Sequence, residues 1–229
     1  MLTRLLSHFL RHQEGQGLRV LEVGCGTGGN LEMLSRRGDV VALDVSHHAL
    51  RVCDQQCRLV LGDAQRLPFK PGTFDAIFAL DLLEHLENDK DLLHELFRAL
   101  KDEGCLVLTV PAVKSLWSGH DVALGHFRRY GREELLDKVR DAGFQVTKLT
   151  FALSLLFPFI YLFRKAQNLQ FRIGRARQHP TGLVQLPRPV NAAFVLFLKL
   201  EALLLPWVSL PAGVSLVCIA SKHRSRNHA

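Results

Sequence analysis

A run of alternating glycines is the first pattern in this 229-residue sequence that could do chemistry. Gly24, Gly26 and Gly28 follow directly after the apolar stretch Leu18–Val23, and a helical pattern begins at Asn30. Glycine lets the backbone approach a ligand closely, and the first amides of a helix have no partner within that helix. The pattern predicts a nucleotide-binding turn, which taken alone also fits a dinucleotide site.

Acidic residues after the following strands narrow this choice. Glu22 precedes the glycines, and Asp44 ends the next apolar stretch, where a carboxylate can accept hydrogen bonds from a ribose diol. Gly62-Asp63-Ala64 follows a third predicted strand, and Phe74-Asp75-Ala76 opens a fourth. In this order, over residues 18–112, the set resembles class I S-adenosylmethionine-dependent methyltransferases of the small-molecule, quinone-type branch.

The resemblance implies S-adenosylmethionine as the cofactor and gives the pocket residues their roles. The glycines would lie against the methionine and ribose portions, Asp44 would hold the ribose, and Val45 would lie beside the adenine. Leu80 would contact the methionine portion through its backbone. The implied cofactor-binding set is Glu22, Gly24, Gly26, Gly28, Asp44, Val45, Asp63, Ala64 and Leu80. For any single aspartate the alternative is a cap or turn, and Asp75 fits that alternative best.

The segment Trp117–Tyr130, which we call the lid, carries the candidates for work on the methyl acceptor. Methyl transfer is an in-line displacement, so the protein mainly aligns the acceptor, and a hydroxyl acceptor also needs a base. The candidate catalytic residues are His120, Asp121 and His126, and the candidate substrate-binding residues are Arg128, Arg129 and Tyr130. Arginine pairs well with phosphate or carboxylate. The alternative is that these side chains satisfy the lid's own polar groups.

A second polar group stands just after the fourth predicted strand. Asp81, Glu84 and His85 have the spacing i, i+3, i+4, which places them on one helical face. They could hold a divalent metal, but no fourth ligand is evident. We therefore assign no metal site and expect this group to cap the helix and contact the cofactor pocket.

These residues need a scaffold that brings the ends of several strands together. Apolar stretches predict strands at 18–23, 40–43, 58–61, 74–79, 105–110, 145–149 and 214–220, with helices between most of them. The alternation predicts an α/β fold with a Rossmann-like, doubly wound sheet. By the resemblance, six of its seven strands are parallel and the last is antiparallel, with a hydrophobic helical insertion before it.

The expected insertion, residues 151–213, differs from the rest of the chain. Residues 151–229 contain 10 of the 29 Lys and Arg residues and a single acid, Glu201, whereas residues 1–150 have a net charge of −2. The uncharged run Phe151–Phe163 would cover only ~20 Å as a helix, short of a ~30 Å hydrocarbon core. Lys199 and Glu201 disfavour a span in the second run. Apolar helices joined by cations are typical of an anionic membrane interface.

We therefore predict four segments: an amphipathic helix in 1–17, a cofactor-binding core in 18–150, the insertion in 151–213, and a last strand with a basic tail in 214–229. The expected protein is a cytoplasmic methyltransferase, peripheral on the inner face of the membrane. It would act on a lipid-like or other small molecule, with O-methylation favoured, as a monomer or homodimer and without a nucleic-acid partner. Five cysteines, an odd number, indicate reduced thiols. The alternatives are a soluble small-molecule methyltransferase with a hydrophobic dimerisation arm, and a non-catalytic cofactor-binding partner protein.

Overall fold

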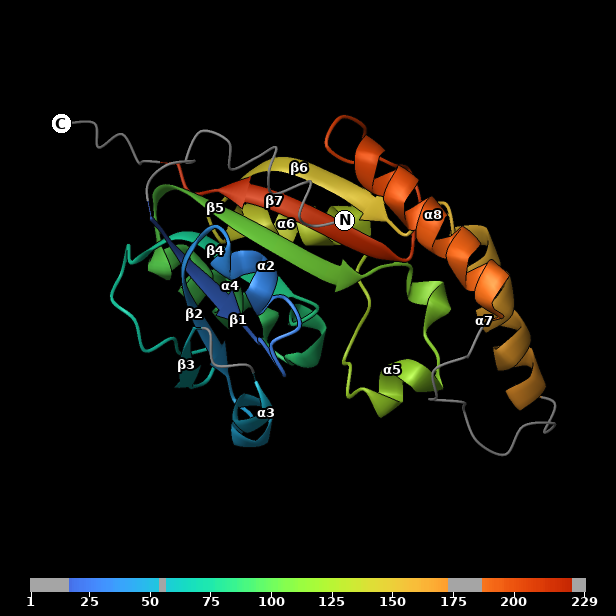
Figure 1. Ribbon diagram of the computed structural model, residues 1–229, viewed down its shortest axis with the longest axis horizontal. Coiled ribbons are helices and arrows are strands. Elements are labelled where there is room, and N and C mark those ends of the chain that lie inside the picture. Colours follow the sequence, from blue (N-terminus) through green and yellow to red (C-terminus); the bar gives the residue numbers. More distant parts are fainter. Residues whose placement is uncertain (1–16, 54–56, 173–186, 224–229) are drawn as a thin grey trace.

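A single twisted sheet organises the part of the chain that the computed structural model describes, residues 17–53, 57–172 and 187–223 (Figure 1). Its strand order is β3-β2-β1-β4-β5-β7-β6. The strands are β1 Leu18–Val23, β2 Gly38–Asp44, β3 Arg58–Leu61, β4 Phe74–Leu80, β5 Leu100–Pro111, β6 Gln145–Ala152 and β7 Ser215–Ser221. The amphipathic helix predicted at the amino terminus lies outside the described residues.

The sheet confirms the predicted fold class. β1 pairs in parallel with β2 and β4, β2 with β3, and β4 with β5. β7 runs antiparallel to both β5 and β6. The central strands are apolar on both faces because helices cover both. In β4, for example, Ile77 and Ala79 belong to one buried cluster, and Ala76 and Phe78 to the other.

Helices connect the strands largely where the sequence predicts them. The helices are α2 Leu31–Ser35, α3 His47–Val52, α4 Asp89–Ala99, α5 Gly119–Ala123, α6 Arg132–Asp141, α7 Phe157–Arg172 and α8 Arg188–Leu204, with 3-10 turns η2 Leu83–His85 and η3 Lys114–Leu116. The uncharged run Phe151–Phe163 is not one helix, because Phe151 and Ala152 continue β6 and pair with Leu216 and Ser215. Leu153, at φ 58°, then turns the chain toward α7.

The insertion leaves the sheet at the rim formed by the carboxyl ends of the parallel strands. Ser215, the first residue of β7, pairs with both Pro111 at the end of β5 and Ala152 at the end of β6. Figure 1 shows α7 and α8 next to each other beyond this end of the sheet. The rings of Phe159 and Phe194 lie 6.3 Å apart and join the two helices.

The buried side of α8 carries its acid. Glu201 has 0% exposure, and its Oε2 accepts a hydrogen bond from the Leu155 backbone amide at 3.0 Å. Glu201 thereby holds α8 to the segment that begins α7. Other side chains of the insertion are apolar and exposed, and we call the following six the apolar surface: Phe159, Leu162, Phe163, Leu196, Leu204 and Trp207. Among the described residues, no helix has the length and apolarity needed to cross a bilayer.

Gly213 allows the closest approach between the end of the insertion and β6. A Cβ at this position would lie 2.3 Å from the Ala152 carbonyl oxygen and 2.9 Å from Ser154 Oγ, so the backbone has to shift to accept one. We expect Gly213→Ala to lower the free energy of unfolding by about 1–3 kcal/mol. Gly17→Ala is the control, because a Cβ at Gly17 meets nothing within 4 Å. Equal thermal melting temperatures for the two variants would contradict this packing.

Candidate active site

Of the three alternating glycines in the turn at the end of β1, one faces open space. Gly24, Gly26 and Gly28 all have positive φ, at 73°, 53° and 87°. A Cβ on Gly24 would lie 2.7 Å from Leu82, and one on Gly28 would lie 2.5 Å from the sulfur of Cys53. A Cβ on Gly26 would meet nothing within 4 Å. The outer two glycines therefore permit tight packing, and Gly26 leaves its side open to a ligand.

Asp44 connects this turn to the end of β2. Its Oδ2 accepts a hydrogen bond from the Gly26 amide at 2.7 Å, and its Oδ1 accepts one from the Ser46 amide at 2.8 Å. A carboxylate oxygen can accept more than one hydrogen bond, so Asp44 keeps acceptor capacity for a diol. Val45, next to it, is 77% exposed and offers an apolar surface at the same rim. The structure thus brings the predicted ribose and adenine contacts together.

Glu22 lies buried beneath the glycine turn. Its side chain is 1% exposed, and its Oε1 accepts a hydrogen bond from Asn30 Nδ2 at 2.9 Å. Its Oε2 has no partner among the described residues. Burial raises the pKa of Glu22 to about 7, and the Asn30 hydrogen bond opposes that rise. An orphaned, readily protonated carboxyl group fits a pocket that receives a polar ligand.

The remaining predicted pocket residues lie at the ends of β3 and β4. Asp63 is exposed and its Oδ1 caps the Gln65 amide at 2.9 Å, while Ala64 is buried. Leu80 is half-buried at the end of β4. Asp75 pairs with Lys101 at 2.7 Å at the start of β4, far along the strand from the rim, in agreement with its structural assignment.

Asp121 is the centre of the lid. Its side chain is fully buried, and its Oδ1 accepts a hydrogen bond from Arg129 Nε at 2.8 Å. Its Oδ2 accepts one from the Ser118 amide at 2.9 Å. Burial alone would raise the pKa of Asp121, but Arg129 and these hydrogen bonds outweigh it and lower the pKa. The carboxylate is therefore charged and held in one orientation.

Two further side chains converge on Asp121. His126 Nδ1 lies 3.2 Å from Oδ1, and Arg164 Nη1 of α7 lies 3.5 Å from Oδ2. Arg164 Nη1 also donates to the Leu116 carbonyl at 3.3 Å, so the insertion holds the segment that leads into the lid. The sequence pattern does not predict this contact of Arg164 with Asp121, because Arg164 only follows an uncharged run.

His126 does not lie alone, because Glu84 and His85 of η2 face it. The rings of His85 and His126 are 4.7 Å apart and nearly perpendicular. Glu84 is 1% exposed, and burial raises its pKa to about 8. Burial, followed by the neighbouring His126, lowers the pKa of His85. His120 is half-buried on α5, and burial, followed by Arg164, lowers its pKa. The neutral imidazole form of both His85 and His120 is thereby favoured.

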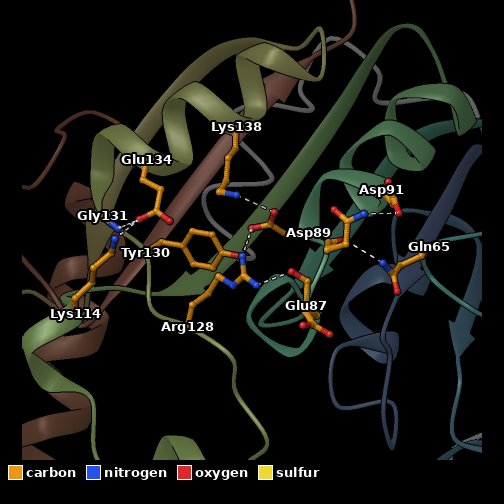
Figure 2. A network of polar contacts seen from close by, with 11 residues as sticks. Gln65, Glu87, Asp89, Asp91, Lys114, Arg128, Tyr130, Gly131, Glu134 and Lys138 are labelled. Carbon is orange, nitrogen blue, oxygen red and sulfur yellow. Dashed lines mark hydrogen bonds and ion pairs between the residues drawn. The ribbon is translucent and has the colours of Figure 1, made fainter.

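The substrate-binding candidates take part in a second network, around Asp89 at the start of α4 (Figure 2). Tyr130 is fully buried, and its hydroxyl donates to Asp89 Oδ2 at 2.8 Å. Lys138 Nζ donates to Asp89 Oδ1 at 2.8 Å, and Arg128 Nη2 donates to the Glu87 carbonyl at 2.6 Å. Asp89 has no special position in the sequence pattern beyond the first turn of a helix, so this network was not predicted.

Arg128 and Arg129 of the lid make contacts within the protein and also line a hollow. Arg129 is 4% exposed, and its Nη1 donates to the Ala112 carbonyl at 3.0 Å. Arg128 and Arg129 also line a hollow of about 320 Å³ together with Lys114, Trp117, Phe127 and Glu134. The hollow combines aromatic rings with cations. Substrate contact by Arg128, Arg129 or Tyr130 stays a prediction.

Comparison with known proteins places this geometry. Residues 21–108 match the methyltransferase domain family, which confirms the methyltransferase resemblance inferred from the glycine turn together with the acidic residues that follow the strands. Over 111 residues the chain is 30% identical to the cycloartenol-C-24-methyltransferase of Arabidopsis thaliana, covering 43% of this chain and 33% of that protein. Over 106 residues it is 32% identical to phthiotriol/phenolphthiotriol dimycocerosates methyltransferase 1 of Mycobacterium ulcerans, covering 43% and 39%. The matches thus span less than half of each relative.

Solved structures share the fold over nearly the whole chain. Phosphoethanolamine N-methyltransferase 2 of Haemonchus contortus, in complex with S-adenosyl-L-methionine, superimposes with a TM-score of 0.61 at 18% identity, covering 96% of this chain and 52% of that one. The cyclase SpnF gives a TM-score of 0.61 at 21% identity, covering 96% and 81%. At such identities the likeness concerns the fold alone.

The raised pKa of Glu22 has a consequence for stability. A carboxyl group whose pKa rises on folding stabilises the protonated native state, and that stability is lost as pH rises from the ordinary value of 4.5 to about 7. We expect the wild type to lose up to about 3 kcal/mol relative to Glu22→Gln across this window. Glu32→Gln is the control, because the Glu32 side chain is 75% exposed. Urea denaturation at a series of pH values measures the difference. Parallel curves for wild type and Glu22→Gln would refute the buried-acid assignment.

Proposed function

We propose that the protein is an S-adenosylmethionine-dependent methyltransferase acting on a lipid-like small molecule at a membrane surface. The premise is that residues 21–108 match the methyltransferase domain family and that the sheet has the strand order of a class I methyltransferase. One observation carries the proposal. Gly26 and Asp44, which are joined by a hydrogen bond, lie at the same rim of the sheet from which the apolar insertion leaves.

The pocket residues fit the methyl donor in kind and placement. The open side of Gly26 admits the donor, the free acceptor capacity of Asp44 suits its ribose, and the exposed Val45 suits its adenine. When bound, S-adenosylmethionine supplies a methyl group on a positively charged sulfur. A lone pair of the acceptor forms the new bond to carbon while the carbon–sulfur bond breaks and leaves its electron pair on sulfur.

The lid supplies the proposed acceptor chemistry. A hydroxyl acceptor loses a proton during transfer, and His126 is the proposed base. Asp121 faces Nδ1 of His126, which leaves Nε2 as the proton-accepting atom, so Asp121 acts as a positioning residue. His120 on α5 is the second candidate base. Arg128 and Arg129 border the hollow beside the lid and would face an anionic group on the substrate.

The insertion supports a lipid-like acceptor. Phe159, Leu162 and Trp207 are 58%, 67% and 71% exposed, although such side chains are normally buried. Lys165, Arg188 and Lys199 add exposed positive charge on α7 and α8. Apolar side chains next to cations favour an anionic lipid surface, to which each cation contributes about 1 kcal/mol. The two methyltransferases mentioned above are named for cycloartenol and for phthiotriol and phenolphthiotriol dimycocerosates.

Two alternatives rest on the same observations. A homodimer could cover the apolar surface, which would make the protein a soluble small-molecule methyltransferase with a dimerisation arm. The second alternative is a function without methyl transfer. The cyclase SpnF shares this fold, and fold alone does not determine chemistry. Donor binding with methyl transfer tests the second alternative, and the state of association tests the first.

Donor binding depends on Gly26. We expect calorimetry to show binding of S-adenosylmethionine and Gly26→Val to weaken it at least tenfold, because the valine side chain would fill the open side of the turn. Gly72→Val is a matched control: Gly72 has φ 61° and open space around its Cβ position, but lies before β4. Transfer of a labelled methyl group into apolar extracts of membranes then tests the reaction. Undiminished affinity in Gly26→Val would contradict the pocket assignment.

Membrane binding depends on the apolar surface. We expect the protein to sediment with phosphatidylglycerol vesicles more than with phosphatidylcholine vesicles, and the triple variant Phe159→Ser, Leu162→Ser, Trp207→Ser to bind more than tenfold more weakly, since apolar burial is lost. Val52→Ser with Leu61→Ser is the control, because these side chains are also exposed but lie on α3 and β3. A wild type that stays in the supernatant and is dimeric by analytical ultracentrifugation would support the dimerisation arm instead.

A further inference from the structure

Three ligand-type side chains from two separate segments converge between η2 and the lid. Glu84 and His85 are consecutive in η2, and His126 belongs to the lid. One potential ligand atom from each of the three lies within 4.8 Å of the other two. Among the described residues, this is the one such group of histidine, cysteine or acidic side chains. A backbone hydrogen bond from the Phe127 amide to the Glu84 carbonyl, 2.7 Å long, holds the two segments together.

Glu84 contributes a buried carboxyl group to this cluster. Its side chain is 1% exposed, and its Oε2 has no hydrogen-bond partner among the described residues. A buried carboxyl oxygen without a partner is destabilising, and native structures rarely keep one without a functional reason. The atoms that face Glu84 from the lid and η2 are imidazole nitrogens, which are good metal ligands in their neutral form.

His126 is oriented as a metal-binding histidine would be. Its Nδ1 lies 3.2 Å from Asp121 Oδ1, so that nitrogen donates to the carboxylate and Nε2 remains free to ligate. Metal-bound histidines commonly donate their other N–H to a carboxylate, which fixes the ring and raises its basicity. Arg129 and the Ser118 amide in turn hold Asp121 in place, so its orientation is set before any ion binds.

We propose that Glu84, His85 and His126 form a binding site for one divalent transition-metal ion of the Zn²⁺ or Co²⁺ kind. Two histidines and one carboxylate form a mixed nitrogen and oxygen set that suits these ions better than Mg²⁺ or Ca²⁺. Ligand bonds of about 2.0–2.2 Å join an ion to atoms at most about 4.4 Å apart, and the three potential ligand atoms all lie within 4.8 Å of one another.

This site differs from the one considered in the sequence. Asp81 shares a predicted helical face with Glu84 and His85, but its Oδ1 accepts a hydrogen bond from Thr109 Oγ1 at 3.0 Å, and it lies outside the cluster. His126 takes the third position, from a segment that follows β5. Three protein ligands leave a coordination position open, as in catalytic rather than structural zinc sites.

The open position has a use that rests on the proposed function. An acceptor hydroxyl bound to the ion would lose its proton more readily, because a divalent cation lowers the pKa of a bound hydroxyl group. His126 would then act as a ligand and not as the base. Ion binding itself does not depend on this role and is measured without methyl donor or acceptor.

The test uses the full chain, free of affinity tags and stripped of metal with a chelator. We expect one equivalent of Co²⁺ to bind per chain with visible absorption bands, and Zn²⁺ to displace it. Glu84→Gln and His126→Gln should each weaken Co²⁺ binding at least tenfold. Asp121→Asn should weaken it about 10–100-fold through the loss of histidine positioning.

Two matched controls separate this cluster from other histidines. His120→Gln changes a neighbouring lid histidine, and His94→Gln changes an exposed histidine on α4, so both should bind Co²⁺ as the wild type does. Circular dichroism checks that each variant is folded. No Co²⁺ binding at millimolar concentration, or equal binding by Glu84→Gln and His120→Gln, would overturn the proposal. Calorimetry with S-adenosylmethionine on the same samples separates failure of the metal site from failure of the proposed function.

Discussion

The ion pairs and hydrogen bonds of the buried Asp121 carboxylate join the lid to the insertion. They also orient His126, which faces His85 of η2. A charge with no solvent exposure is strongly unfavourable unless it is paired, and its partners come from the lid and from α7. Arg129 and Ser118 belong to the lid, His126 faces Glu84 of η2, and Arg164 comes from α7. Removal of any one partner leaves the charge less compensated, so the position of α7 and the orientation of His126 are coupled.

The rim of the sheet brings together the ends of the strands that carry the predicted cofactor-binding residues and the start of the insertion. Parallel strands bring their carboxyl ends to one edge, and the residues that follow β1, β2 and β4 all lie there. Because β7 is antiparallel to β6, the first residue of β7 lies at the same edge as the last residue of β6. A segment inserted between these two strands therefore starts and ends at that edge. Topology thus places the start and the end of the insertion at the same edge of the sheet as Gly26 and Asp44.

Much of this arrangement could be predicted from sequence. The parts that could not be predicted depend on contacts between residues that are distant in the chain. Apolar stretches separated by turns located the strands, and the alternating glycines located the tight turn after β1, because backbone conformation and strand ends are local properties. The division of Phe151–Phe163 between β6 and α7 depends on pairing with β7, which the run itself does not encode. The contacts of Asp89 with Tyr130 and of Glu84 with His126 join residues distant in the chain, and spacing carries no information about them.

The fold does not determine the reaction, which depends on the side chains of the lid and η2. The cyclase SpnF shares the architecture, so the chemistry of this chain has to be read from the lid and η2. There, His126 cannot use Nε2 both to bind an ion and to accept a proton, and the unpartnered oxygen of Glu84 favours the ion. A metal-bound hydroxyl needs only a weak base, whereas an unassisted one needs His126 free. Under this proposal, the occupant of the cluster of Glu84, His85 and His126 would decide which acceptor groups can be methylated.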